Sequence, residues 1–346
     1  MVRINYLKGE KQEFLDFINF VTLRDKFAII SHNDLDGIAS ALFLEKILES
    51  KEVEIGYIDF VTIDRDLAKE LSIKFKELGI TKVIFCDLNL DEFDFEGYSE
   101  LRKEIDVFLI DHHPMNPAIS EFDKVIKTDS QDCSAMTIFE LGEGIFDREA
   151  WQWLNCAAIF SDFSYKEEKN FLYLQDLYPN ISMENISSSV PGIISRKINS
   201  ALVYYGDNKK YVYDLVKKRD VDSITEVHEI IEDEIDRFVE NYKDNEIYVP
   251  EKNLHFLEVD SKFDIASTVV TMISKLKSED SFVVMQRKDD FVKFSARNQS
   301  SSIDMGQLMK RCVEGLDGAN GGGHVPAAAA KIQAKDLDEF KRRLLE

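Results

Sequence analysis

The residues of this chain that are best suited to chemistry lie in short clusters of acidic and histidine side chains. The first cluster is His32–Gly37 (HNDLDG) and the second is Asp111–His113 (DHH). The chain has six histidines, and four of them lie in these two clusters or at His324, which ends a third. Carboxylate oxygens and imidazole nitrogens together suit manganese or a similar divalent cation. The clusters therefore predict a metal site.

The number of candidate ligands predicts two metal ions. A pair of divalent cations about 3.5–4 Å apart shares a carboxylate, lowers the pKa of a bridging water and holds a phosphate for in-line attack. An aspartate before a helix is also a common helix cap, but a cap explains one of the two aspartates in the first cluster and not both. We expect six metal ligands, more than one open catalytic site needs: His32, Asp34, Asp36, Asp87, His112 and Asp162.

A third cluster near the C-terminus is typical of phosphate binding. Three consecutive glycines let the backbone approach a ligand and point its N–H groups at an anion. An arginine after a predicted strand is a natural guanidinium partner for a phosphate. A glycine run is also common in flexible loops, and the arginine can equally be an ordinary surface residue. We expect the glycine run to form a phosphate-binding loop, with these residues holding the substrate phosphate: Arg297, Gly321, Gly322, Gly323 and His324.

The elements around the first two clusters alternate between strand and helix. Apolar runs predict strands over residues 26–31, 53–60, 82–86 and 107–110, and helical spacing predicts helices over 38–48, 67–78 and 150–160. Such alternation indicates an α/β fold with a parallel sheet and helices on both of its faces. Ligands in these sheets bind beyond the carboxyl ends of the strands, which is where the acidic clusters fall.

The rest of the chain predicts a helical linker and a smaller α/β domain. We expect a catalytic metal-binding domain over residues 1–190, a linker over 191–245 and a substrate-binding domain over 246–346, with the active site in the cleft between the two domains. Apolar residues at three- or four-residue steps predict a helix face in the linker that packs on a neighbouring element or forms a partner-binding groove: Ile224, Val227, Ile231, Ile235, Phe238 and Tyr242.

Charge and composition limit the classes of substrate and location. The 346 residues carry a formal net charge of -22, which repels long polyanions and gives no general attraction to duplex nucleic acid. The four cysteines lie far apart without Cys-x-x-Cys spacing, so neither a thiolate zinc site nor a disulfide framework is indicated. No apolar run approaches the roughly 18 residues that span a bilayer. We expect a cytoplasmic protein without a membrane partner.

Taken together, these clusters resemble the motifs of the DHH phosphoesterase family, in the subgroup with a C-terminal DHH-associated domain that includes RecJ-like exonucleases and nanoRNases. The first cluster matches the first motif of that family, Asp87 the second, Asp111–His113 the third and Asp162 the fourth. Residues 321–324 match its Gly-Gly-Gly-His signature. Family members often read Asp-Thr-Gly at the fourth motif, whereas this chain reads Asp-Phe-Ser at residues 162–164.

The resemblance implies a dinuclear centre of manganese, or of magnesium. It places one ion on His32, Asp34 and Asp87, and the other on four ligands that again include Asp87 as the bridge: Asp36, Asp87, His112 and Asp162. It gives Asp111 and His113 catalytic roles, either in the shell that supports the metals or at the phosphate.

The expected activity is hydrolysis of short single-stranded RNA or DNA from one end, one nucleotide at a time. A second enzymatic reading is a phosphatase or phosphodiesterase for small nucleotides, such as linear or cyclic dinucleotides or a 3′,5′-bisphosphate. A third reading is a non-catalytic binding module, as in replication-associated relatives that lost their metals. The apolar linker face leaves room for a protein partner or a homodimer.

Overall fold

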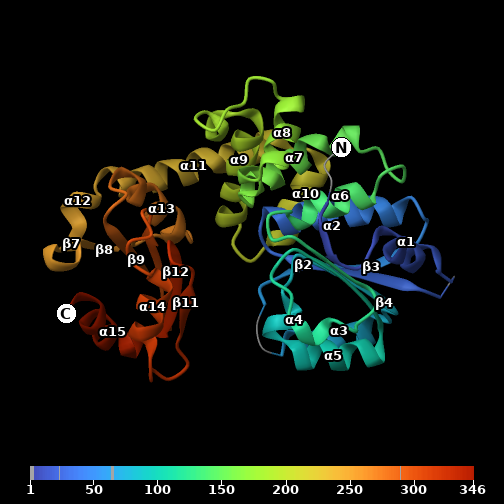
Figure 1. Ribbon diagram of the computed structural model, residues 1–346, viewed down its shortest axis with the longest axis horizontal. Coiled ribbons are helices and arrows are strands. Elements are labelled where there is room, and N and C mark those ends of the chain that lie inside the picture. The colour runs from blue at the N-terminus through green and yellow to red at the C-terminus, as the bar shows by residue number, and fades with distance from the viewer. Residues whose placement is uncertain (1–3, 23, 64–65, 289) are drawn as a thin grey trace. The chain divides into compact units, whose positions relative to one another are not determined.

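The computed structural model describes residues 4–22, 24–63, 66–288 and 290–346, which form two compact units (Figure 1). The first unit covers Met1–Thr225 and the second covers Glu226–Glu346, and each contains a six-stranded sheet. The division falls inside the range predicted as the linker. Across the described residues, every helix is too short or too polar to cross a membrane.

The sheet of the first unit is parallel except for one edge strand. Its order is β1-β6-β5-β4-β2-β3, and only β1 runs antiparallel, against β6. Strand β2 lies between β3 and β4, so the order of the strands reverses there and creates a switch point where ligands bind in such sheets. The strands are β1 (Tyr6–Lys8), β2 (Lys26–His32), β3 (Glu54–Val61), β4 (Lys82–Cys86), β5 (Asp106–Asp111) and β6 (Val125–Thr128).

Helices cover both faces of this sheet, as predicted (Figure 1). One face carries α3 (Leu67–Leu78), α4 (Leu90–Phe93) and α5 (Phe95–Glu104), which enclose a core with alternate residues of β2, β4 and β5. The other face carries α1 (Lys11–Asn19), α2 (Leu35–Glu49), α6 (Ser134–Leu141) and α7 (Gln152–Ser161). Helix α2 is buried on nearly all sides because α6 and α7 pack on it as well as the sheet.

The connection from β2 to α2 is unusually tight. Ser31 Oγ donates a 2.8 Å hydrogen bond to the carbonyl of Gly37, which lies in the first turn of α2. A Cβ atom at Gly37 would overlap the carbonyl oxygen of His32, so only glycine allows this approach. The first turn of α2 is therefore held directly against the end of β2, which places the two aspartates of this segment beside the strand end.

Helices continue the first unit and lead into the second. They are α8 (Glu168–Leu177), α9 (Val190–Tyr204), α10 (Lys209–Lys218), α11 (Val221–Glu240) and α12 (Tyr242–Asn245). The predicted apolar face is buried at five of its six positions, and Phe238 is half-buried. The prediction that this face packs against neighbouring elements is confirmed.

The second unit is the smaller α/β unit that the sequence predicts. Its sheet has the order β11-β12-β10-β9-β8-β7, with β8 and β9 parallel and the other neighbours antiparallel. Helices α14 and α15 enclose a core in which the rings of Phe294 and Phe340 stack at 3.8 Å. The elements are β7 (Glu246–Val249), β8 (Leu254–Glu258), α13 (Ala266–Leu276), β9 (Ser281–Lys288), β10 (Phe291–Asn298), α14 (Met305–Val313), β11 (Asn320–Gly323), β12 (Ala327–Gln333) and α15 (Leu337–Leu345).

The glycine run is not a loop, and the prediction of one was wrong. Gly321, Gly322 and Gly323 lie in edge strand β11 and pair with Ala330, Ala329 and Ala328 of β12. Helix α14 packs directly on this strand: a Cβ atom at Gly321 would lie 2.9 Å from the carbonyl oxygen of Met309. Pairing with β12 and close helix packing therefore account for much of the glycine content.

One buried lysine joins two strands of the first sheet. Lys127 of β6 lies opposite Asp111 of β5 and is fully buried. Its Nζ atom is 2.6 Å from Asp111 Oδ2, 2.6 Å from Asp91 Oδ1 and 3.4 Å from Asn89 Oδ1. One buried cation thus pairs with two buried carboxylates, and removal of one partner from such a network leaves uncompensated charge.

We expect Lys127→Met to lower the free energy of unfolding by about 3–5 kcal/mol, because Asp91 and Asp111 would stay buried without a cation. Urea denaturation measures this loss. The control is Lys103→Met: Lys103 is 67% exposed and pairs with Glu100, so the loss should stay below about 1 kcal/mol. Equal losses in both variants would refute a structural role for the buried network.

Candidate metal centre

Three neighbouring strands deliver the candidate ligands of the first unit to one edge of the sheet. His32 ends β2, Asp87 follows β4 and His112 follows β5. Asp34 caps α2 by accepting a 3.0 Å hydrogen bond from the amide of Gly37. The cluster therefore lies at the switch point between β2 and β4, because parallel strands end on the same side.

The first group of possible ligands contains His32, Asp34 and Asp87. His32 Nδ1 lies 2.9 Å from Asp34 Oδ2 and 3.7 Å from Asp87 Oδ2. The three ligand atoms lie within 4.8 Å of one another, so one cation can contact all of them. This group has the same members as the set that the family resemblance implies for one ion.

The second group contains Asp36, His112 and Asp162. His112 Nε2 is 4.0 Å from Asp36 Oδ2, and His112 Nδ1 is 3.7 Å from Asp162 Oδ2. Asp36 accepts 2.8 Å hydrogen bonds from the amides of Ser134 and Ala135, which begin α6. The start of this helix stabilises the carboxylate of Asp36, because unpaired N–H groups there favour negative charge.

The third group contains Asp87, His112 and His113. His112 Nε2 is 3.3 Å from Asp87 Oδ1, while its Nδ1 lies 3.2 Å from the carbonyl oxygen of Ser130. The Nδ1–H group donates to the carbonyl of Ser130, and Nε2 faces the carboxylate of Asp87. Asp87 occurs in two of the three groups, and it is the residue that the resemblance places between two ions. His113 lies close enough to Asp87 and His112 to belong to this candidate group.

The electrostatics of the cluster show that it lacks positive charge. Burial raises the pKa of Asp87 well above its usual range, and the nearby carboxylates of Asp36 and Asp34 raise it further. Asp87 Oδ2 is buried, and no hydrogen-bond donor reaches it among the residues that the structure describes. Burial also raises the pKa of Asp162 to about 7. This donor set fits divalent cations, which would supply the missing charge.

The two histidines respond to the same excess of carboxylates. Burial lowers the pKa of His112, but the contact with Asp87 and the charge of Asp162 outweigh it, so the pKa is raised well above its usual value. Burial also lowers the pKa of His32, but the charge of Asp34 and its contact with the ring outweigh burial, so the pKa of His32 is raised. Both imidazoles therefore attract a positive charge, which a proton supplies when no metal ion is bound.

Asp111 differs from the other carboxylates because its partners are already in place. Its Oδ1 is 2.8 Å from His113 Nδ1, and its Oδ2 contacts Lys127. Burial acts to raise the pKa of Asp111, but His113 and Lys127 reverse the effect and hold it below its usual range. Asp111 is thus placed to orient His113, with neither oxygen left for a metal or a substrate.

The sequence analysis missed several residues that build this centre. Lys127 was not singled out, although a lysine within the short apolar strand VIKT is an unusual choice and was a usable signal. The amides of Ser134 and Ala135 and the carbonyl of Ser130 are backbone groups, so the residue types give no sign of their role. They hydrogen-bond to Asp36 and His112 only once distant parts of the chain have folded together.

The predicted phosphate-binding residues lie together in the second unit. Arg297 of β10 pairs with Ala327 of β12, and Ala327 exchanges two backbone hydrogen bonds with His324. Arg297 and His324 are therefore at the same end of this sheet. The guanidinium of Arg297 donates to Ser267 Oγ at 3.2 Å, and burial lowers its pKa. Within the described ranges it contacts no carboxylate, so its charge is available for an anion.

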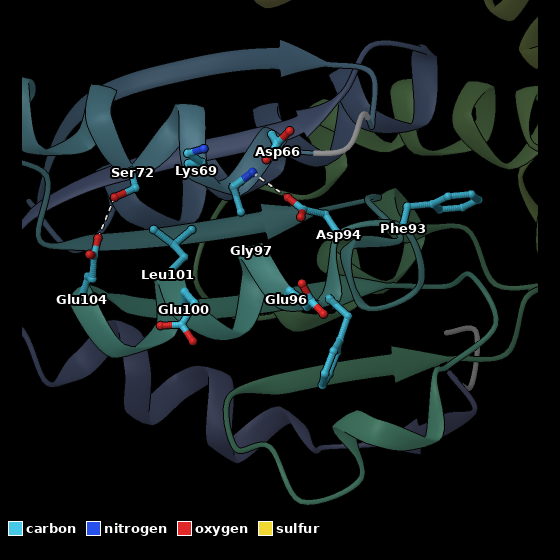
Figure 2. A pocket seen from close by; sticks show the side chains of 12 residues that line it. Asp66, Lys69, Ser72, Phe93, Asp94, Glu96, Gly97, Glu100, Leu101 and Glu104 are labelled. Carbon is cyan, nitrogen blue, oxygen red and sulfur yellow. Dashed lines mark hydrogen bonds between the residues drawn. The ribbon is translucent and has the colours of Figure 1, made fainter. Parts of the chain in front are cut away.

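A large cavity of the first unit is not part of this centre. It has a volume of about 690 Å³ and lies between α3 and α5 (Figure 2). None of the predicted site residues lines it, and its wall is rich in carboxylates: Asp66, Asp94, Glu96, Glu100 and Glu104. An anionic phosphate would be repelled from such a wall.

Two family models match the chain. The model for the N-terminal domain of the DHH family matches residues 26–160, and the model for the DHHA1 domain matches residues 251–346. No curated protein matches the chain by sequence. The first model spans β2 to α7 and so contains most of the candidate ligands, while the second contains Arg297 and the glycine run.

Solved structures share this fold at low sequence identity. RecJ from Thermus thermophilus, in complex with Mn²⁺, matches with a TM-score of 0.73 and 14% identity over 99% of this chain and 55% of its own. Another exonuclease RecJ bound to manganese matches with a TM-score of 0.70 and 14% identity, covering 98% and 94% of the two chains. CDC45 from Entamoeba histolytica matches with a TM-score of 0.53 and 11% identity, covering 96% and 98%.

The matched domains and the ligand groups agree with one another. The DHH model covers the strands that carry Asp87 and the Asp111–His113 motif, and the DHHA1 model covers the unit that follows the helices. The chain therefore belongs to the DHH family of phosphoesterases, with a DHHA1 domain following its DHH domain.

Proposed function

We propose that this phosphoesterase is a two-metal phosphodiesterase that hydrolyses short single-stranded oligonucleotides from one end. The observation that carries the proposal is the position of Asp87. It is shared between two ligand groups, and one of its oxygens is buried without a hydrogen-bond partner among the residues that the structure describes. A carboxylate in that position suits two cations at once, as two-metal phosphoryl chemistry requires.

The ligands would divide between the two cations as the family resemblance implies. His32, Asp34 and Asp87 would hold one ion, as in one of the groups. Four side chains would hold the other and combine members of the two remaining groups: Asp36, Asp87, His112 and Asp162. When bound, manganese or magnesium would act as a Lewis acid on the phosphate and lower the pKa of a water. The cluster itself provides the oxygen and nitrogen donors and fixes their positions before the metals arrive.

His113 and its partners have the geometry of an oriented catalytic group. The Nδ1–H group of His113 donates to Asp111, which leaves Nε2 free for a metal or a phosphate oxygen. Lys127 Nζ contacts Asp111 Oδ2 and lies 3.5 Å from the backbone oxygen of His113, so it restrains the residue at two points. We assign His113 to the reacting phosphate and Asp111 to the positioning of His113.

Residues of the second unit would bind a phosphate of the substrate. Arg297 offers a guanidinium without a carboxylate partner in the described part of the chain, and His324 lies at the same end of the sheet. The glycines of β11 leave edge-strand backbone groups open to a ligand: Gly321, Gly322 and Gly323. Together they would hold one phosphate of the strand that is being cleaved.

The net charge of -22 favours short substrates over long ones. A long polyanion would meet repulsion beyond the residues that bind it locally. The same centre could also hydrolyse linear or cyclic dinucleotides and 3′,5′-bisphosphates. Hydrolysis rates measured side by side on these compounds and on RNA and DNA ladders would identify the preferred substrate. A non-catalytic role, considered because of the fold shared with CDC45, is disfavoured because the full ligand set is present.

We expect Asp87→Asn to lower kcat on a labelled pentanucleotide by at least about 10³-fold, because the metal ions supply several kcal/mol of transition-state stabilisation. Elemental analysis should find two manganese ions per wild-type chain and fewer in the variant. Asp123→Asn is the control, since Asp123 is exposed and pairs with Arg102 outside the centre.

The same variant separates a metal role from a structural one. In metal-free protein Asp87→Asn should unfold at a temperature equal to or above that of the wild type, since it removes a repelled carboxylate. Manganese should raise the unfolding temperature of the wild type more than that of the variant. Full activity in the variant, or a wild type that binds no metal, would rule the proposal out.

We expect Arg297→Ala and His324→Ala each to raise KM for the pentanucleotide about 10-fold or more, because a hydrogen bond to a charged phosphate is lost. Manganese content should not change. Steady-state kinetics provides the measurement, with Arg287→Ala as the control because Arg287 is exposed on the same sheet and pairs with Glu258. Unchanged KM values would remove these residues from the substrate site.

A further inference from the structure

An aromatic turn directly follows the candidate metal ligand Asp162. Residues 160–166 read FSDFSYK, so that Phe160, Phe163 and Tyr165 flank the aspartate and Lys166 ends the segment. The segment joins the end of α7 to a short 3-10 helix (Ser164–Lys166). Neither the ligand groups nor the proposed hydrolysis gives these aromatic side chains a role.

The rings of Phe160, Phe163 and Tyr165 pack together, and the ring of Phe163 is the exposed one. We call these three rings the platform. The rings of Phe160 and Tyr165 stack at 5.4 Å with an interplanar angle of 16°, and the ring of Phe163 lies 6.2 Å from that of Tyr165. Phe160 and Tyr165 are half-buried, whereas Phe163 is 54% exposed. The two inner rings thus support Phe163, whose own ring is presented largely to solvent.

The backbone of Phe163 is held in a costly conformation. Its φ of 57° and ψ of 12° lie in the left-handed region, where a bulky side chain is rare. Two hydrogen bonds fix the turn: Phe163 N donates to Phe160 O at 3.2 Å, and Lys166 N donates to Phe163 O at 3.0 Å. An exposed ring contributes little burial to offset this strain, so folding alone does not explain a phenylalanine here.

The fourth motif itself does not require an aromatic residue at position 163. The family that this chain resembles often has threonine after the metal-binding aspartate, and this chain departs from that pattern. Metal binding therefore does not demand the ring. The departure concerns the residue that directly follows the candidate ligand Asp162.

Lys166 places a positive charge over one face of the Phe163 ring, so a base would stack on the other face. Its Nζ atom lies 4.8 Å from the centroid of the Phe163 ring. In the ranges that the structure describes, no carboxylate pairs with it. An exposed ring beside an unpaired ammonium group matches a nucleotide, which carries an aromatic base next to a phosphate.

We propose that Phe163 stacks a nucleobase next to the phosphate that is cleaved, with Lys166 meeting an adjacent phosphate. Phe163 directly follows Asp162 in the chain, and the proposal places the stacked base on the nucleotide at or beside the metal that Asp162 would bind. The inference rests on the proposed function and narrows it. The substrate is a nucleotide chain with bases, not an inorganic polyphosphate or a sugar phosphate.

Equilibrium binding tests the stacking independently of turnover. The probes are the dinucleotide pApA and the same dinucleotide with one base replaced by an abasic tetrahydrofuran residue, titrated with Ca²⁺ in place of manganese. Wild-type protein should bind pApA about 10-fold more tightly than the abasic compound, in keeping with base–aromatic stacking. Phe163→Gly should bind both compounds with the weaker affinity.

Glycine is the informative replacement because it accepts the left-handed backbone without strain, so lost binding does not reflect a misfolded turn. Phe163→Trp should keep the preference for pApA, since tryptophan retains a stacking face. Phe20→Ala is the matched control: Phe20 is 76% exposed and ends α1, away from the metal ligands in sequence. Manganese content should be equal in all of these proteins.

The outcomes separate the two proposals. If wild-type protein binds pApA and the abasic compound equally, or if Phe163→Gly keeps the preference, the stacking role is overturned whatever the turnover. If the preference is present and depends on Phe163 but the manganese-loaded protein cleaves neither compound, stacking stands as a nucleotide-binding property and the proposed hydrolysis fails.

Discussion

The structure of the first unit is constrained by the convergence of several carboxylates at one edge of a parallel sheet, where Asp36 and Asp87 are buried. Asp34, Asp36, Asp87 and Asp162 converge there because their strands and helices end at the same switch point. Like charges at such separations oppose folding unless cations join them, and the raised pKa of Asp87 expresses this cost. The carboxylates and imidazoles of this centre form groups that could each hold a metal ion, which would supply the missing positive charge.

The negative charge of the buried carboxylates is compensated in one part of this region and not in another. Asp91 and Asp111 receive a permanent cation, since Lys127 is fully buried between them. The carboxylates nearer the strand ends receive no lysine or arginine at comparable distances among the described residues, and are left for exchangeable cations. The division separates two roles: the lowered pKa of Asp111 keeps it ionised beside His113, while the candidate ligands stay unpaired with lysine or arginine among the described residues.

The sequence predicted the parts of this fold that local patterns determine. The helix over 67–78 and the strand over 82–86 have the predicted bounds, because apolar spacing and flanking residues specify them locally. The glycine run was misjudged because a loop and an edge strand have the same local signal, and pairing with β12 decides between them. Lys127 was missed because its role exists only once β6 lies beside β5.

The fold and the metal ligands determine the class of chemistry, whereas substrate choice depends on residues that the fold does not require. Phe163 illustrates the difference: its neighbour Asp162 belongs to a ligand group, yet the exposed ring of Phe163 adds strain to the turn and little burial. Architecture shared with RecJ at 14% identity shows the fold alone, and the phosphoesterase family follows from the matched DHH and DHHA1 domains. The strained turn, where this chain departs from the family pattern, is the place where selection between substrates would act on this shared fold.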